Sequence, residues 1–146
     1  MTIPSARTPG LRAYLSIKYH ADQANRARIE ALSRALQSIG IETYCVARDL
    51  EQWGARRFAA RDLMQQSLQA VLASDIVLID LSEKGVGIGI EAGYAHAHRR
   101  PVIVIAPSTE ALSTTLLGIA DGVIVSSNLD DTVAQLHGLI ASLDVP

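Results

Sequence analysis

Residues 74–106, SDIVLIDLSEKGVGIGIEAGYAHAHRRPVIVIA, decide the fold. The segments 75–80 and 101–106 are short and almost continuously apolar, which is typical of parallel strands covered on both faces. About twenty residues separate them, enough for one crossover helix, which we expect to open at Glu91. The stretch therefore predicts a strand–helix–strand unit with a right-handed crossover. It also places the Gly-rich loop 81–89 at the carboxyl end of a strand, where an open α/β sheet binds its ligand.

The rest of the chain alternates strands with helices. Apolar runs predict strands at 11–17, 41–46 and 122–126, and apolar residues at helical spacing predict helices at 22–38, 56–72 and from Asn128 onward. A charged loop at 48–57 carries the only tryptophan, Trp53, and a short helix is expected between 107 and 121. The order predicts an α/β fold, a three-layer doubly wound (Rossmann/flavodoxin-like) five-stranded parallel sheet.

Length and composition exclude several classes of protein. The chain has 146 residues, with 49% hydrophobic and 19% charged residues, which predicts one globular domain at 11–146 behind a flexible tail at 1–10. The net charge of −2 gives no basic face for a nucleic-acid polymer. The single cysteine excludes an internal disulfide. Without an apolar run of membrane-spanning length or a signal peptide, we expect no membrane association and a cytoplasmic protein.

Glu91 is the main candidate for chemistry. It is expected in the first helical turn, where a carboxylate also gains stability from the helix dipole without any further role. The glycines before it, Gly85, Gly87 and Gly89, let a ligand approach the backbone and expose amide donors. Such a carboxylate would face a pocket and could attack a carbon or activate water. Asp80, which ends the preceding strand, is expected to line the same site.

Other catalytic signatures do not fit. The run GVGIGIEAG at 85–93 is not the dinucleotide fingerprint, because isoleucine or alanine stands where the third glycine belongs. The sequence contains neither a P-loop lysine–serine pair nor a Gly-x-Ser-x-Gly elbow. The four histidines show no metal-ligand spacing with carboxylates, and Cys45 is expected inside a strand. We therefore expect no metal, no cofactor and no hydrolase triad.

The lysines favour an anionic ligand. Only Lys18 and Lys84 occur, against eleven arginines, and both fall in loops at the carboxyl ends of strands. Two residues can share one rim of the sheet by chance. The functional interpretation is a pair of cations over an anion such as a phosphate.

These residues resemble a known family. The stretch 74–106 is similar to the core motif of the nucleoside 2-deoxyribosyltransferase superfamily, which includes the 2′-deoxynucleoside 5′-phosphate N-hydrolases and the pyrimidine-nucleotide N-glycosidases. The segment Gly-x-Gly-x-Glu-x-Gly-Tyr-Ala at 87–95 carries the resemblance. It extends to Tyr14-Leu-Ser-Ile-Lys18 and to Leu112-Ser113, and covers roughly residues 12–126.

The resemblance implies a reaction. In this superfamily the glutamate of the motif attacks C1′ of the sugar, and here that residue is Glu91. The N-glycosidic bond would break through a glycosyl-enzyme intermediate, as in retaining glycosidases. Water would then give hydrolysis and free base, whereas a second base would give transfer.

Two departures from the superfamily pattern bear on the substrate. Members usually carry an aspartate eight residues before the position of Asp75, and here that residue is Ser67. Transferases also carry an acid six residues before the nucleophile, where this chain has Gly85, next to Lys84. Losing an acid and keeping a cation favours a 5′-phosphate over a free 5′-hydroxyl.

The resemblance also implies phosphate contacts. In the phosphate hydrolases the first loop has Ser-Ile-Arg, which corresponds to Ser16, Ile17 and Lys18. A serine corresponding to Ser113 reaches the phosphate of a neighbouring subunit, which implies a homodimer or a higher homo-oligomer. Transferases end in a tail that completes the next subunit's site, and the end of this sequence at Pro146 favours the hydrolases instead.

The sequence thus predicts an enzyme acting on a small-molecule nucleoside or nucleotide. Cleavage of a nucleoside 5′-monophosphate to free base is the leading hypothesis. Base exchange by a nucleoside 2-deoxyribosyltransferase is the second. The third is a non-catalytic nucleotide-binding module, which Ser67 favours most.

Overall fold

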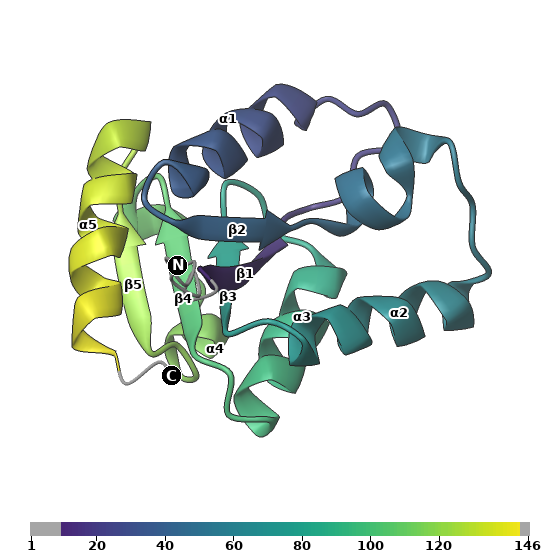
Figure 1. Cartoon of the computed structure of the whole chain (residues 1–146). Coiled ribbons are helices and arrows are strands. Elements are labelled where there is room, and N and C mark those ends of the chain that lie inside the picture. The colour runs from purple at the N-terminus through teal and green to yellow at the C-terminus, as the bar shows by residue number, and fades with distance from the viewer. Residues whose placement is uncertain (1–9, 144–146) are drawn as a thin grey trace, which may run out of the picture.

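The fold is built on a parallel sheet that a computed structural model describes together with the rest of residues 10–143 (Figure 1). All but the last residue of the predicted tail lies outside these residues. The sheet order is β2-β1-β3-β4-β5, and every neighbouring pair is parallel. This confirms the predicted α/β class. The strands are β1 (Leu11–Ser16), β2 (Ile41–Tyr44), β3 (Ile76–Asp80), β4 (Val102–Ala106) and β5 (Gly122–Val125).

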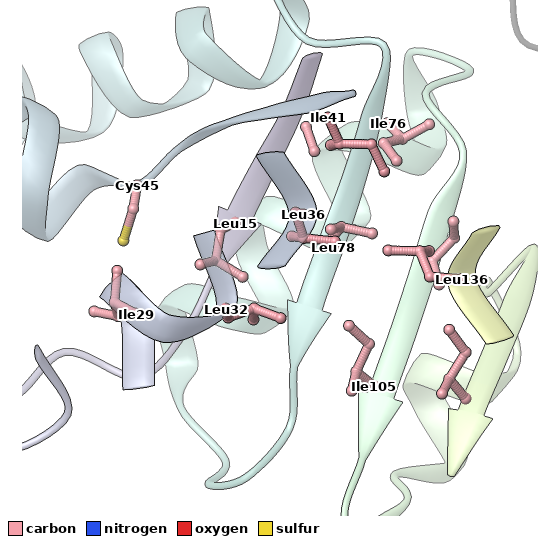
Figure 2. Packing of buried hydrophobic residues seen from close by; sticks show 13 residues of the cluster. Leu15, Ile29, Leu32, Leu36, Ile41, Cys45, Ile76, Leu78, Ile105 and Leu136 are labelled. Atoms are coloured by element: carbon pink, nitrogen blue, oxygen red, sulfur yellow. The ribbon is translucent and has the colours of Figure 1, made fainter. Parts of the chain in front are cut away.

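Helices cover both faces of the sheet (Figure 1). On one face α1 and α5 enclose a core cluster in which Leu32, Leu36 and Leu136 meet Leu15 and Leu78 (Figure 2). On the other face α2, α3 and α4 enclose a second cluster. The helices are α1 (Arg26–Gln37), α2 (Ala60–Leu72), α3 (Val86–Ala97), α4 (Thr114–Leu117) and α5 (Leu129–Ser142).

The strand order fixes where a ligand can bind. From the β1/β3 pair the sheet grows outward in both directions, with β2 added on one side and β4 and β5 on the other. Loops that leave such a switch point diverge to opposite faces and open a crevice at the carboxyl ends of the strands. The loops after β1 and β3 meet there, and the His20 ring contacts the Glu83 carboxylate across them.

The start of α3 corrects one expectation. The helix begins at Val86, after Gly85 as its N-cap, so Gly87 and Gly89 are helical and the loop ends four residues early. Glu91 is therefore in the second turn and does not open the helix, contrary to the sequence-based prediction. Glycine is a poor helix former, but Ile88 and the alanines that follow bury one face of the helix on the sheet. That packing outweighs the low propensity.

The segment after β2 also differs from its prediction. Cys45 follows the strand, and Val46–Leu50 forms a single π-helical turn where a strand end and a loop were expected. A 3₁₀ turn follows at Gln52–Gly54. Its three residues have φ of 49°, 57° and 89°, in the left-handed region that only the glycine adopts without strain. The segment 46–54 therefore consists of two consecutive helical turns and is not an irregular loop.

The remaining elements match within a few residues. Helix α1 begins at Arg26 and α2 at Ala60, both four residues later than expected; β1, β2 and β5 end one or two residues early, and β3 and β4 begin one residue late. Asn128 caps α5 as predicted, since its Oδ1 accepts a hydrogen bond of 3.0 Å from the Asp131 amide. Within residues 10–143, no helix is long and apolar enough to cross a membrane.

Candidate active site

Glu91 lies beside two hydroxyl groups from β1. Its Oε2 is buried, and so are the hydroxyl oxygens of Tyr14 and Ser16. Each hydroxyl lies close enough to favour the ionised carboxylate, but none of the three atoms completes a hydrogen bond of normal geometry within the described chain. A buried polar group without a partner costs about 1–3 kcal/mol. Three of them at one point indicate a place kept for a ligand.

The local sequence explains this meeting. Residues two apart on a strand point to the same face, so Tyr14 and Ser16 both face α3. Gly87 lies one turn before Glu91 on α3, and a Cβ there would be in ordinary van der Waals contact with the Glu91 Oε1, at 3.7 Å.

The surroundings change the acidity of Glu91. Burial raises the pKa of its carboxyl from 4.5 to about 7, and the hydroxyls of Tyr14 and Ser16 offset part of this rise. Burial also raises the pKa of the Tyr14 hydroxyl, with the Glu91 charge adding to the effect, so Tyr14 stays a proton donor in hydrogen bonds. A carboxylate that is desolvated, lies near hydroxyl groups and has an oxygen without a hydrogen-bond partner is a strong nucleophile.

A small cavity opens at this carboxylate. Its volume is about 70 Å³, and its polar lining includes Glu91, Lys18, Tyr19 and Glu51. Ile17 belongs to the same wall. The volume suits a few water molecules or part of a ligand, not a whole nucleotide.

A second cavity holds the other predicted residues. It measures about 190 Å³, and its lining includes Lys84, Gly85, Gly89 and Ser113. The Ser113 and Thr115 hydroxyls are 2.9 Å apart at its edge. The two cavities are neighbours, because a Cβ on Gly85 would stand 3.7 Å from the Lys18 Cγ. A ligand could therefore extend from one cavity to the other past the Lys18 stem.

Asp80 is placed differently from the residues around the cavities. Its carboxylate is fully buried, accepts a hydrogen bond of 2.6 Å from the Arg28 Nε, and accepts another of 2.9 Å from the Ser82 amide. Asp80 lines neither of the two cavities. These two hydrogen bonds fix the position of α1 and of the loop after β3 relative to the sheet. Asp80 therefore has a structural role beside the site.

This arrangement gives a stability prediction. Arg28→Ala leaves the buried Asp80 carboxylate without its cation, which costs 3–5 kcal/mol for a fully buried pair. Because the Arg28 side chain is 44% exposed and water can replace part of the interaction, we expect a loss of about 2 kcal/mol in the free energy of unfolding. Urea unfolding at pH 7 measures it. Arg34→Ala, on the exposed side of the same helix, is the control and should cost under about 0.5 kcal/mol. Equal losses in both variants would refute the structural role of the pair.

Ser67 does not join the site. It is buried in α2, and its hydroxyl donates a hydrogen bond of 2.7 Å to the Leu63 carbonyl one turn earlier. It lines neither of the two cavities. The position at which the superfamily usually carries an aspartate thus offers no free polar group here.

Two larger hollows lie elsewhere. They measure about 430 and 510 Å³ and flank the edge strand β2, away from Glu91. Arg48 and Asp49, two of the charged residues in their lining, already have partners within the chain. Arg48 donates to the Thr43 carbonyl and Asp49 accepts from the Cys45 amide, both on the outer edge of the strand. These contacts cover the unpaired strand edge, so we place the site at the smaller cavities.

The sequence analysis missed three groups at the site. Tyr14 could have been found, because a strand period of two puts it on the same face as Ser16. Thr115 lies in the four-residue helix α4 and Glu51 between two short helical turns, and elements this short show no periodicity that indicates which way a side chain points. Trp53, the tryptophan of the charged loop, packs against the core cluster of the α1 side, with the Arg26 guanidinium 4.5 Å above its ring.

Known proteins resemble this chain in sequence and in fold. No family model matches the chain. A protein of Thermofilum pendens that carries the provisional name 2′-deoxynucleoside 5′-phosphate N-hydrolase 1 is 22% identical over 137 residues, which are 89% of this chain and 95% of that protein.

Solved structures share the fold. The 2-deoxyribosyltransferase of Bacillus psychrosaccharolyticus is 14% identical, with a TM-score of 0.67 over 84% of this chain and 90% of its own. The CMP N-glycosidase of Clostridium botulinum is 18% identical, with a TM-score of 0.59 over 86% and 97%. These structures show that the fold is shared. The sequence relative is in keeping with the resemblance to the nucleoside 2-deoxyribosyltransferase superfamily that the motif at 87–95 indicated.

Proposed function

We propose that this chain, as a protein of the nucleoside 2-deoxyribosyltransferase superfamily, hydrolyses the N-glycosidic bond of a nucleoside 5′-monophosphate with Glu91 as the nucleophile. The observation that carries the proposal is the buried, unpartnered Glu91 oxygen beside two equally unpartnered hydroxyls. The relatives are N-glycosyl hydrolases or transferases by name, which supports an enzyme of this kind.

The reaction follows from the properties of the carboxylate. The ionised Glu91 attacks C1′ as the bond to the base nitrogen breaks, and a glycosyl ester forms on Glu91. Water then attacks C1′, and the sugar phosphate leaves. The Tyr14 and Ser16 hydroxyls lie close enough to favour the ionised carboxylate, so they stabilise its charge before the attack and when it returns.

The two lysines indicate where the phosphate of the substrate would bind. Lys84, Ser113 and Thr115 surround the 190 Å³ cavity, and Lys18 lies at its border with the Glu91 cavity. Ammonium and hydroxyl groups are typical ligands of a phosphate. With the phosphate in that cavity, the sugar would span the Lys18 border and present C1′ to Glu91.

A substrate panel tests the proposal. Common ribo- and deoxynucleoside monophosphates and the matching nucleosides are incubated with the protein, and free base is quantified. We expect base release from at least one monophosphate, faster than from its nucleoside. Base exchange outpacing hydrolysis would assign a transferase instead. Thermal stabilisation by a nucleotide without base release would assign a binding module.

Lys84→Ala tests the phosphate end. Losing one charge-assisted hydrogen bond, worth about 1.5–3 kcal/mol, should raise KM for the monophosphate roughly 10- to 100-fold and leave the nucleoside reaction nearly unchanged. Steady-state kinetics on both substrates measure the difference. Arg61→Ala removes a cation from the exposed face of α2 and serves as the control. An equal effect of Lys84→Ala on both substrates would contradict a phosphate at this cavity.

We also propose that the protein works as a homodimer or higher homo-oligomer. Val86 and Ile90 lie one helical turn apart on α3, and their side chains are 84% and 48% exposed. An apolar pair beside a candidate site favours contact with a second copy. Light scattering coupled to size exclusion should give at least twice the mass of one chain, and Ile90→Glu should lower it. A single-chain mass for the wild type would refute the proposal.

A further inference from the structure

The cavity at Glu91 contains a second carboxylate, that of Glu51. Both residues line the same 70 Å³ cavity, although they are forty residues apart in the sequence. Glu51 lies in the segment between β2 and α2, and Glu91 lies in α3. Glu51 is half-buried, and within residues 10–143 its carboxylate makes no hydrogen bond or ion pair. A second acid in the lining of the nucleophile's cavity indicates a second chemical role at this site.

The backbone holds Glu51 firmly in this place. Its amide donates a hydrogen bond of 2.9 Å to the Val46 carbonyl, and its own carbonyl accepts bonds of 3.0 Å from the amides of Gly54 and Arg56. The next three residues have positive φ. Strained backbone of this kind persists only where its surroundings impose it, and it gathers at functional sites. The Arg26 guanidinium over the Trp53 ring is one such constraint.

Glycosidic cleavage through a carboxylate ester also needs a proton carrier. The leaving nitrogen must gain a proton, and the attacking water must lose one. Two buried groups beside Glu91 are unsuited: burial raises the pKa of the Tyr14 hydroxyl out of reach and that of the Cys45 thiol to about 11. Ser67 and Asp80 are engaged within their own chain.

Resting on the proposed function, we propose that Glu51 is the acid–base partner of Glu91. As Glu91 forms its bond to C1′, the C1′–N bond breaks, its electron pair stays on the base nitrogen, and that nitrogen takes the proton of the Glu51 carboxyl. In the second half, water bonds to C1′ and gives its proton to the Glu51 carboxylate. The electron pair of the C1′–O bond returns to Glu91. One nucleotide and one water become free base and sugar phosphate, and both acids regain their starting states.

The two carboxyls differ in their surroundings. Burial raises the pKa of both. The hydroxyls of Tyr14 and Ser16 favour the anion of Glu91, which must attack, whereas no donor of this kind is found at Glu51 among the described residues. Lys18 is the cation in the lining of the cavity and stands between this space and the proposed phosphate end.

A comparison of leaving groups tests the acid role. For Glu51→Gln, which keeps size and polarity, we expect kcat/KM on the nucleotide to fall about 10²- to 10⁴-fold. The loss should shrink to under about tenfold with a 4-nitrophenyl glycoside 5′-phosphate of the same sugar, because nitrophenolate leaves without a proton. Glu42→Gln, on the exposed side of β2, is the matched control and should match the wild type. Equal losses on both substrates, or no loss on the nucleotide, would overturn the proposal.

Azide tests the base role. Glu51→Ala should form the glycosyl-enzyme from the nitrophenyl substrate but hydrolyse it slowly, so that mass spectrometry finds a glycosyl group on the protein. Azide is an anion and needs no base, so it should raise the turnover of Glu51→Ala at least about tenfold and yield a glycosyl azide. It should not accelerate the wild type. Failure of azide to accelerate a folded Glu51→Ala would overturn the assignment, with circular dichroism verifying the fold.

These outcomes separate the two proposals. A wild type that releases base from no nucleotide refutes the proposed function itself. An active wild type whose Glu51 variants behave like Glu42→Gln refutes only the role of Glu51.

Discussion

Replacing Glu91 with glutamine is expected to reduce base release by at least about 10⁴-fold, because the amide has no anionic oxygen with which to form the ester at C1′. The substitution keeps the size of the side chain and can still accept hydrogen bonds from Tyr14 and Ser16. Loss of activity would therefore report on the nucleophile and not on the shape of the cavity. Release of base from the preferred monophosphate, followed by chromatography, measures it.

A matched control strengthens that test. Glu110→Gln makes the same chemical change at an exposed residue of the 3₁₀ turn Thr109–Ala111 and should retain full activity. Rapid quenching of the wild type with substrate should also add the mass of the sugar phosphate to the protein, and Glu91→Gln should show no such species. Retention of more than about a tenth of the activity by Glu91→Gln would rule out the glutamate ester.

The same substitution is expected to stabilise the fold at alkaline pH. The pKa of Glu91 is about 7 in the folded chain against an ordinary 4.5, so ionising it there costs about 3 kcal/mol of folding free energy. Glutamine carries no such cost. Urea unfolding at pH 8.5 should thus show Glu91→Gln to be more stable than the wild type by about 3 kcal/mol.

The sign of the pH dependence follows from the raised pKa. Below pH 4.5 the carboxyl is protonated in both the folded and the unfolded chain, so the two proteins should be equally stable. Between pH 4.5 and about 7 only the unfolded chain ionises, and the wild type loses stability as pH rises. Above about 7 the full difference is present. A constant difference from pH 4 to pH 9, or a less stable variant at pH 8.5, would contradict a desolvated Glu91.

Activity should follow the opposite trend. The nucleophile must be ionised, so kcat/KM of the wild type should fall about tenfold for each pH unit below about 7. The buried position of Glu91 thus lowers the stability of the fold and raises the reactivity of the carboxylate, which is a common arrangement at active sites.

Local pattern in the sequence was sufficient for the architecture. The continuous apolar runs that became β3 and β4 predicted buried parallel strands, and helical spacing located α1, α2 and α5 to within a few residues. Asn128 marked the start of α5 through its own side chain. Such features depend on residues close together in the chain, so they can be read directly from the sequence.

The start of α3 could not be predicted from local sequence pattern. Gly87 and Gly89 favour a loop by propensity, and only the burial of Ile88 and Ala92 against the sheet makes them helical. The π-helical turn at Val46–Leu50 likewise depends on a residue distant in the sequence, since the Arg48 Nη1 donates a hydrogen bond of 2.7 Å to the Ser33 hydroxyl of α1.

What the sequence by itself determined is the doubly wound sheet and the identity of the Glu91 motif, because apolar periodicity and a short Gly-rich segment are properties of neighbouring residues. Only the tertiary structure brought Tyr14, Ser16 and Glu51 to that carboxylate and withdrew Ser67 and Asp80 from the cavities. These contacts join residues from separate elements, namely β1, the segment after β2 and α3, and their geometry depends on how whole elements pack across the switch point of the sheet.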